Sequence, residues 1–275
     1  MRIVVCAKEV PDPDAVNAYA VSGRLTIAAD GTSIAQAAVP LLMNAYDEQA
    51  IEAALRLRDA GHDCSLTVVT VGTARPEYLR KAAALGADQV VQIRHSLSRP
   101  DTLVVGAILA GYIRASGGAD LVLCGRQASD DDQGVVPAVV AEELGLPLVT
   151  MAREIRLIRE TLTVVRVTPA GDETVECDLP AVVTVSSELG APRMPTARDL
   201  IAARSKKPSL IDVSTLGVPD HALAPRLVLR SMVVPQKKGN CEFISGDTLQ
   251  EAARALVERL RAVGLAAGSG NVAVE

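Results

Sequence analysis

Hydrophobic and polar positions follow two alternating periods along the first half of the chain. Short apolar runs of the kind that form buried strands fall at 2–7, 65–71, 89–93 and 120–124. Between them, apolar residues recur at helical spacing over 45–60, 75–85, 101–116 and 135–145. Strands that alternate with helices are typical of βαβ units. The pattern therefore predicts an α/β protein built on a doubly wound, Rossmann-like parallel sheet.

A long insert, residues 9–43, separates the first predicted strand from the first predicted helix. It contains Pro11, Pro13, Gly23 and the short run 24–28. These features predict a loop with a small hairpin. A connection of this length in a compact fold is usually functional or bound to a partner.

The pattern changes after Pro147. Extended runs follow one another closely, at 152–158, 161–168, 173–178 and 181–185. They predict an antiparallel addition that continues the sheet.

The last third of the chain loses its periodicity. Residues 188–246 read as irregular, and one amphipathic helix returns at 247–263. A lone helix after an irregular stretch cannot bury its own apolar face, so we expect this arm to wrap around another chain. The expected boundary separates a nucleotide-binding domain, 1–187, from a docking loop, arm and terminal helix, 188–275.

The strand predicted at 120–124 ends in a turn that suits a nucleotide site. Gly125 follows the apolar run, and a polar, acidic loop leads from it to the helix predicted at 135–145. The N-terminus of a helix attracts phosphate, and parallel sheets bind ligands outside the carboxyl ends of their strands. We therefore expect a nucleotide at this edge of the sheet.

Three other features allow both a structural and a functional interpretation. Asn44, with Asp47 three residues later, suits a helix N-cap, and a cap at this edge can also face the nucleotide. Gly72 would let the backbone approach a ligand, although an ordinary turn is the more common explanation. We assign at least two of the acids Asp130–Asp132 to the start of the next helix, where the dipole favours negative charge, and not to a metal site.

Composition and charge exclude several classes of function. The chain has no Trp, one Phe and four Tyr, so stacking on nucleobases is not expected. A net charge of −5, with one short basic cluster at 204–207, argues against a nucleic-acid partner. Five widely spaced cysteines without a C-x-x-C pair indicate reduced thiols and no zinc site. Because no run is long enough to span a membrane and the apolar start is too short for a signal peptide, we expect a cytoplasmic protein.

Signatures of catalysis are missing from the sequence. It has no G-x-G-x-x-G after a strand, no G-x-x-x-x-G-K-[ST] and no G-x-S-x-G. His62, His95 and His221 lie far apart in polar turns. We therefore expect a nucleotide-binding protein without a catalytic set of its own.

Several blocks of residues, in a fixed order, resemble the β subunit of electron-transfer flavoprotein over almost the whole chain. The blocks are Val4–Asp12, Met43–Asp47, Glu52–Leu55, Leu79–Ala82, Leu85–Asp88, Gly125–Asp132, Leu179–Val185, Ala191–Arg193 and Pro235–Gly239. Each block is short, and their common order and spacing make the resemblance specific.

The resemblance implies an electron-carrier subunit that pairs with a larger α subunit carrying redox-active FAD. Electrons would arrive from a flavin dehydrogenase, typically an acyl-CoA dehydrogenase of fatty acid β-oxidation, and leave to a quinone oxidoreductase or another acceptor. It also implies an AMP in the sheet crevice, and Tyr46 matches the position that approaches the partner's flavin. Carried over by motif, the nucleotide contacts are Cys6, Ala7, Asn44, Val71, Gly72, Asp130, Asp132, Gln133, Gly134, Val135 and Val136.

The resemblance also assigns the last third of the chain to partners. The stretch 188–204 matches the loop that docks the dehydrogenase, and the irregular tail matches the arm that wraps the α subunit. The candidate docking contacts are Leu189, Pro192, Arg193 and Ala197. Relatives have a leucine anchor at the position of Ala197, so an acyl-CoA dehydrogenase of the usual kind is not the expected donor.

A second departure lies in the phosphate loop. Many relatives read Thr-x-Gln-Val-Gly-Pro after the acidic triplet, whereas this chain reads Gln133-Gly134-Val135-Val136-Pro137. Fewer donors remain for a phosphate, so we expect AMP to bind more loosely than in typical relatives. Two alternatives stay open: a second FAD in place of AMP, as in electron-bifurcating members, and a stand-alone nucleotide-binding domain.

Overall fold

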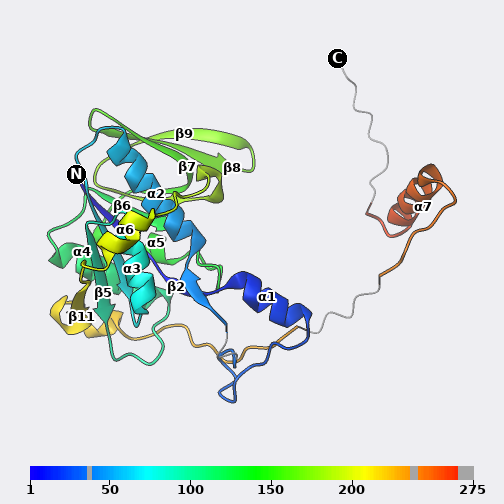
Figure 1. The fold of residues 1–275 in the computed structure, drawn as a ribbon, viewed down its shortest axis with the longest axis horizontal. Helices are drawn as coiled ribbons and strands as arrows, with labels where there is room; N and C mark the ends of the chain where they lie inside the picture. The colour runs from blue at the N-terminus through cyan, green and yellow to red at the C-terminus, as the bar shows by residue number, and fades with distance from the viewer. Residues whose placement is uncertain (36–38, 236–240, 266–275) are drawn as a thin grey trace. The chain divides into compact units, whose positions relative to one another are not determined.

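The computed structural model describes residues 1–35, 39–235 and 241–265 of the chain (Figure 1). The chain divides into two units, Met1–Val233 and Val234–Glu275, which are described separately.

The described residues of the larger unit form a nine-stranded sheet in the order β11-β5-β4-β1-β6-β10-β7-β8-β9. Neighbouring strands from β11 to β7 run parallel, and β7, β8 and β9 pair antiparallel. The strands are β1 Arg2–Cys6, β4 Ser65–Val71, β5 Gln89–Arg94, β6 Leu121–Gly125, β7 Leu148–Ile158, β8 Thr161–Thr168, β9 Gly171–Asp178, β10 Ala181–Val185 and β11 Ser209–Asp212. The predicted parallel sheet with an antiparallel addition is confirmed, but the run 181–185 was wrongly placed in that addition: it forms β10, which runs parallel between β6 and β7.

Helices cover both faces of the parallel sheet. One face carries α2 Ala45–Asp59 and α3 Pro76–Leu85, and the other carries α4 Thr102–Ala115 and α5 Val136–Leu144. Their bounds agree with the predicted helices to within one residue at each end. The apolar residues whose spacing predicted these helices are therefore the residues that pack against the sheet.

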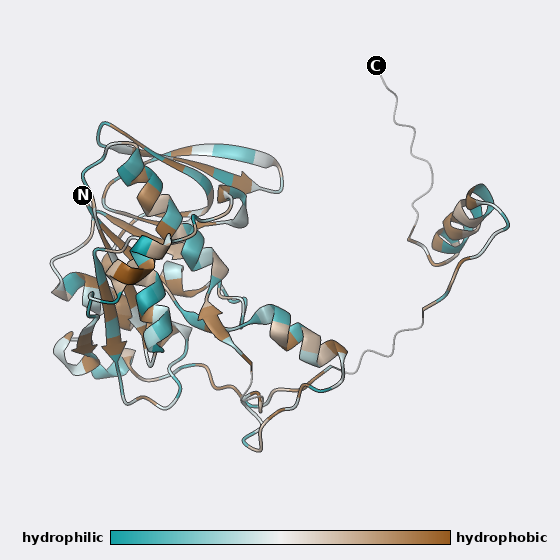
Figure 2. Ribbon diagram, viewed as in Figure 1, coloured by the Kyte–Doolittle hydropathy of each residue, from teal (hydrophilic) through white to brown (hydrophobic). Residues whose placement is uncertain are grey.

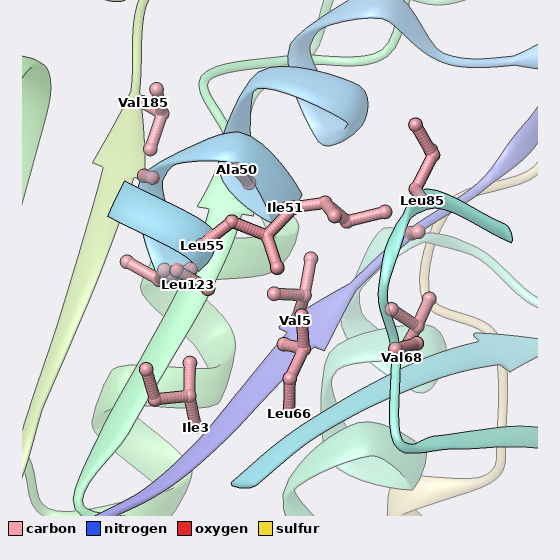
Figure 3. Packing of buried hydrophobic residues seen from close by; sticks show 14 of the residues in the cluster. Ile3, Val5, Ala50, Ile51, Leu55, Leu66, Val68, Leu85, Leu123 and Val185 are labelled. Atoms are coloured by element: carbon pink, nitrogen blue, oxygen red, sulfur yellow. The ribbon is translucent and has the colours of Figure 1, made fainter. Parts of the chain in front are cut away.

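Strand β1 supplies residues to both layers because successive side chains of a strand point to opposite faces. Ile3 and Val5 pack in the core under α2 and α3, and Val4 and Cys6 pack under α4 and α5. Figure 3 shows Ile51 and Leu55 of α2 beside Val5 and Leu66 in the first of these cores. Strands buried on both faces read as continuous apolar runs, which is how β1, β6 and β10 appear in the sequence (Figure 2).

The insert contains more structure than the predicted loop and hairpin. Strand β2, Glu9–Pro11, pairs antiparallel with β3, Leu41–Met43. Between them lies a helix, α1 Pro13–Val21, which the sequence pattern did not predict. Pro13 indicated a loop, but proline is favoured in the first turn of a helix, and the Asp12 side chain caps it by accepting from the N–H of Asp14. A smaller hairpin is present further on, where Ile27 bridges to Ile34.

The stretch after β10 is also more ordered than the sequence indicated. Two regular elements lie in it: the seven-residue helix α6, Ala197–Ala203, which packs against α3, and β11, which pairs in parallel with β5. It also contains the short 3₁₀ turns η1 Ser187–Leu189, η2 Val213–Thr215 and η3 Asp220–Ala222. The expectation that all of 188–246 is irregular was wrong, because both elements are too short to show a period. The first unit consequently extends to Val233, beyond the boundary expected after residue 187.

The smaller unit contains α7, Leu249–Ala262, as predicted for 247–263. Thr248 and Glu251 form a complete capping box, in which each side chain bonds the other's backbone N–H. All residues of α7 lie within the described range, and none of them is buried. Its apolar face includes Leu256 and Val257, both more than two-fifths exposed. Of the Pro235–Gly239 block, residues 236–239 lie outside the described residues.

Among the described helices, none combines the length and the apolar character needed to cross a bilayer.

Candidate functional site

A cavity of about 300 Å³ opens at the carboxyl ends of β1, β4 and β6. The order of the sheet reverses here, since β4 and β6 lie on opposite sides of β1. Such a reversal opens a crevice in which doubly wound folds bind ligands. The lining also includes the first residues of α4 and α5, and Asn44 and Asp47 from the start of α2.

Most of the predicted nucleotide contacts share this cavity. The residues that line it are Cys6, Ala7, Asn44, Val71, Gln133, Gly134, Val135 and Val136. Gly72 lies one residue beyond the lining, with φ of 95°, and its N–H donates to the carbonyl of Ile93 at 2.8 Å. This geometry is that of an ordinary strand-to-helix turn. Asp130 and Asp132 lie in the same loop as the lining residue Asp131.

Asn44 occupies the N-cap position of α2, but within the described residues its side chain makes no capping hydrogen bond. Its amide nitrogen instead donates to the carbonyl of Gln127 at 2.8 Å, and its amide oxygen accepts from the N–H of Ser129 at 3.3 Å. The predicted cap with Asp47 was wrong, because both side chains turn away from the helix. Asn44 fixes the loop after β6 against the start of α2.

Asp47 joins the ends of two neighbouring strands. Its Oδ2 accepts from the N–H of Lys8 at 2.8 Å, and its Oδ1 accepts from the N–H of Gly125 at 3.1 Å. A Cβ on Gly125 would lie 2.4 Å from Oδ1, so only glycine allows this approach. Burial raises the pKa of Asp47 to about 7, against the lowering effect of these hydrogen bonds. No sequence pattern points to this role, because Lys8 and Gly125 are distant from Asp47 in the chain.

The start of α5 presents free donors to the cavity. Within the described residues, the backbone N–H groups of Gly134, Val135 and Val136 donate no hydrogen bond. Gly134 adopts φ of 63°, and a Cβ there would lie 2.9 Å from the carbonyl oxygen of Arg126. Pro137 at the second helical position has no N–H to offer. Together with the helix dipole, the three free donors suit an anionic group.

The acidic triplet does not serve the start of α5, which begins later, at Val136. Lys8 Nζ lies 2.7 Å from Asp130 and 3.4 Å from Asp131, and the amide of Gln127 donates to Asp132 at 2.7 Å. The expectation of helix-terminal charges was therefore wrong, since these carboxylates have partners of their own. No cluster of three or more metal-ligating side chains occurs in the described part of the chain.

Two cysteines lie at the bottom of the cavity, on neighbouring strands. Cys6 of β1 is in register with Cys124 of β6, and both are buried. The contact with Cys6 and the burial raise the pKa of the Cys124 thiol well above its usual range. Cys124 is therefore a neutral thiol at neutral pH, and it supplies a weakly polar wall.

Tyr46 and the predicted docking residues lie outside the cavity. The guanidinium of Arg126 lies 5.4 Å from the centre of the Tyr46 ring. Leu189 is buried in η1, Ala197 is the exposed first residue of α6, and Pro192 is half-buried. Arg193 bonds to α2 through its side chain and its backbone N–H.

The fold and the cavity define an α/β protein with a cavity at the switch point of a doubly wound sheet. The Electron transfer flavoprotein domain matches residues 32–216. The electron transfer flavoprotein subunit beta of Megasphaera elsdenii is 31% identical, over 94% of this chain and 98% of that protein. The caffeyl-CoA reductase-Etf complex subunit CarD of Acetobacterium woodii is 33% identical, over 95% and 98% respectively. The subunit beta of Mycobacterium tuberculosis is 34% identical, over 86% and 90%.

The chain therefore belongs to the electron transfer flavoprotein family, and its likeness to the β subunits of that family is confirmed. Proteins of this family carry electrons.

Proposed function

We propose that this chain is the β subunit of a heterodimeric electron carrier and holds AMP in the cavity at the carboxyl ends of β1, β4 and β6. An α subunit supplies the FAD that carries the electrons, and this chain contributes no catalytic residue. The single observation that carries the nucleotide assignment is the group of free N–H donors at Gly134–Val136, at the switch point of the sheet.

The N–H groups at the start of α5 meet the phosphate in this proposal. Asn44 holds the opposite loop in place, and Cys6, Ala7 and Val71 supply the apolar wall. Lys8 adds a positive charge at the rim, where it pairs with Asp130. Because Pro137 lacks a donor and Val135 has no polar side chain, AMP binds loosely here.

A second candidate is FAD in the same cavity, in an electron-bifurcating carrier. The observation that favours it is the likeness to a subunit of a caffeyl-CoA reductase-Etf complex, which covers 95% of this chain. In both versions the electrons enter from a flavin dehydrogenase that docks on 188–204, with Arg193 and Ala197 in the docking region. They leave to a quinone oxidoreductase or another acceptor, and the carrier works in the cytoplasm.

The α subunit covers the apolar surface that the chain leaves exposed. In the larger unit these exposed side chains include Leu227, Val228 and Leu229, and in the smaller unit they include Leu256 and Val257 of α7. Exposed apolar side chains in such number mark an interaction site. Tyr46 approaches the flavin of the α subunit.

The deciding experiment is co-expression with an electron transfer flavoprotein α subunit from the same organism, followed by acid extraction and mass spectrometry of bound nucleotides. One AMP and one FAD per heterodimer support the proposal. Two FAD and no AMP establish the bifurcating version, and one FAD without AMP contradicts a nucleotide in this cavity.

A charge variant tests the phosphate position. Val135→Asp places a carboxylate among the free donors, so the retained nucleotide should fall at least about tenfold. Ala138→Asp adds the same charge to α5 at an exposed position outside the cavity and serves as the matched control. Equal nucleotide content in the two variants would place the phosphate elsewhere.

A further inference from the structure

One face of α2 holds the segment 187–193 through four side chains. They are Gln49, Glu52, Arg56 and Asp59, spaced by three, four and three residues, so they form one stripe along the helix. The amide of Gln49 donates to the carbonyl of Gly190 at 3.2 Å, and Arg56 Nη1 donates to the carbonyl of Leu189 at 2.8 Å. The stripe therefore fixes the backbone of this segment.

Arg193 is the last residue held, and it carries most of the bonds. Its Nε donates to Glu52 Oε2 at 2.7 Å, and its backbone N–H donates to the same oxygen at 3.1 Å. Its Nη2 donates to Glu52 Oε1 at 3.2 Å and to Asp59 Oδ2 at 2.6 Å. A fork of this kind fixes orientation as well as position, which a lysine could not do.

Glu52 remains charged although it is buried. Burial by itself would raise the pKa of Glu52, but hydrogen bonds from Arg193 and Arg56 outweigh it and lower the pKa. A buried carboxylate with its partner removed is costly, so the pair persists at neutral pH.

The held segment leads directly to an exposed apolar group. Met194 follows Arg193 and is 83% exposed, and Leu200 and Ile201 of α6 are 50% and 65% exposed. Residues 191–196 contain no helix or strand, so the bonds to Arg193 decide where Met194 lies. Ala197, at the position of the expected anchor, offers only a methyl group.

We propose that Glu52 and Asp59 are positioning residues, which hold Arg193 so that Met194 is presented as the apolar anchor for an electron-donating flavin dehydrogenase. This inference rests on the proposed function. A thioether side chain is long and adaptable, so it fills an apolar pocket that Ala197 cannot reach. A segment held in place before docking loses less conformational entropy when it binds.

Basic side chains near Met194 indicate which charges surround the pocket on the partner. Arg198, Arg204 and Lys207 are exposed between residues 194 and 207, where Asp199 is the single carboxylate. The dehydrogenase surface that fits here has an apolar pocket with acidic residues around it.

The clamp is tested on the purified complex with the α subunit, without any donor. In Glu52→Gln, trypsin should cut after Arg193 at least about tenfold faster, because the guanidinium is freed to enter the protease. Amide exchange over 189–194 should accelerate, while exchange over β1 and β6 stays unchanged. Glu142→Gln, an exposed carboxylate on α5, is the control. Equal cleavage and exchange in the wild-type and Glu52→Gln complexes would overturn the clamp.

The anchor is tested by electron transfer from two probes, a medium-chain acyl-CoA dehydrogenase with octanoyl-CoA and a short-chain one with butyryl-CoA. In Met194→Ala, the KM for the dehydrogenase should rise about tenfold and kcat should stay within twofold. Met194→Leu should restore the wild-type KM. Glu52→Gln should raise KM in the same way, with reduction by dithionite unchanged.

The outcomes separate this inference from the proposed function. An unchanged KM in Met194→Ala overturns the anchor while the carrier function stands. If the wild-type complex accepts electrons from neither dehydrogenase, Met194 does not replace the leucine anchor that is missing at Ala197, and the anchor is overturned while the carrier function stands. The trypsin and exchange results still decide whether Glu52 holds the segment.

Discussion

Two helices of similar length, α2 with 15 residues and α7 with 14, are stabilised in opposite ways. Helix α7 has a complete capping box and basic residues in its last turn, yet none of its described residues is buried. Helix α2 lacks a side-chain cap within the described residues and buries eight of its own. Local signals form α7, whereas tertiary packing holds α2. The polar residues at the start of α2 are therefore free to build the cavity instead of capping the helix.

The two buried carboxylates of α2, Asp47 and Glu52, have pKa values that shift in opposite directions. Burial raises the pKa of Asp47, which accepts from two backbone N–H groups and, within the described residues, from no guanidinium. Glu52 has a lowered pKa, because Arg193 and Arg56 bond to it directly. One helix thus carries a carboxylate in its first turn that binds a proton near neutral pH and another near its middle that stays charged.

The largest expected effect concerns the proton on Asp47. Its native pKa of about 7 lies above the unfolded value of 3.8, so the native state binds the proton more tightly. The stability gained from this proton is complete below about pH 4 and is lost as the pH rises to about 7. A difference of about three between the native and the unfolded pKa corresponds to about 4 kcal/mol of unfolding free energy.

The measurement is urea unfolding of the wild type and Asp47→Asn between pH 4 and 8. The unfolding free energy of the wild type minus that of Asp47→Asn should fall by up to about 4 kcal/mol as the pH rises, since only the wild type has this group. Carboxylates with lowered pKa, such as Glu52 and Asp101, act in the opposite direction but occur in both proteins and cancel. A difference that is constant across the range would mean that Asp47 is charged throughout.

The next largest effect is expected from a variant that disturbs the close packing of α2 against β6. Gly125→Ala should lower the unfolding free energy by about 3 kcal/mol, because the new Cβ meets Asp47 Oδ1 at 2.4 Å and Tyr46 Cβ at 2.7 Å. Gly118→Ala has open space around it and φ of 86°, so backbone strain alone should cost about 1 kcal/mol. If thermal unfolding gives equal losses for the two variants, α2 is not held tightly against β6.

The same contrast explains what could be predicted from the sequence. The bounds of α2 and α5 followed from apolar spacing, because the residues that show the period are those that the sheet buries. Helix α6 and strand β11 were missed, since seven and four residues are too few for a period and their neighbours stabilise them. The cavity could be placed from the strand ends, but the bonds of Asp47 could not, because they join residues 39 and 78 positions apart.

A smaller loss of unfolding free energy is expected for Asn44→Ala. The pattern of amide exchange in this variant distinguishes the loss of a helix cap from the loss of a loop contact. Asn44→Ala leaves the carbonyl of Gln127 and the N–H of Ser129 without their buried partners, which costs about 2 kcal/mol of unfolding free energy. Amide exchange should accelerate over 126–135 and stay unchanged in the first turn of α2. Asn17→Ala, on the exposed side of α1, is the control. Faster exchange confined to the first turn of α2 would restore the role of a helix cap.

The smallest effect is expected in α7, whose capping box is one of several local contributions to its stability. Thr248→Ala removes the hydroxyl that accepts from the N–H of Glu251, which costs about 1 kcal/mol of helix stability. Amide exchange throughout α7 should accelerate about fivefold, while the urea midpoint of the larger unit stays unchanged. Gln250→Ala, an exposed change in the same turn, should leave exchange within twofold. A shift of the urea midpoint by Thr248→Ala would show that α7 is stabilised by tertiary packing, as α2 is, and the contrast between the two helices would fail.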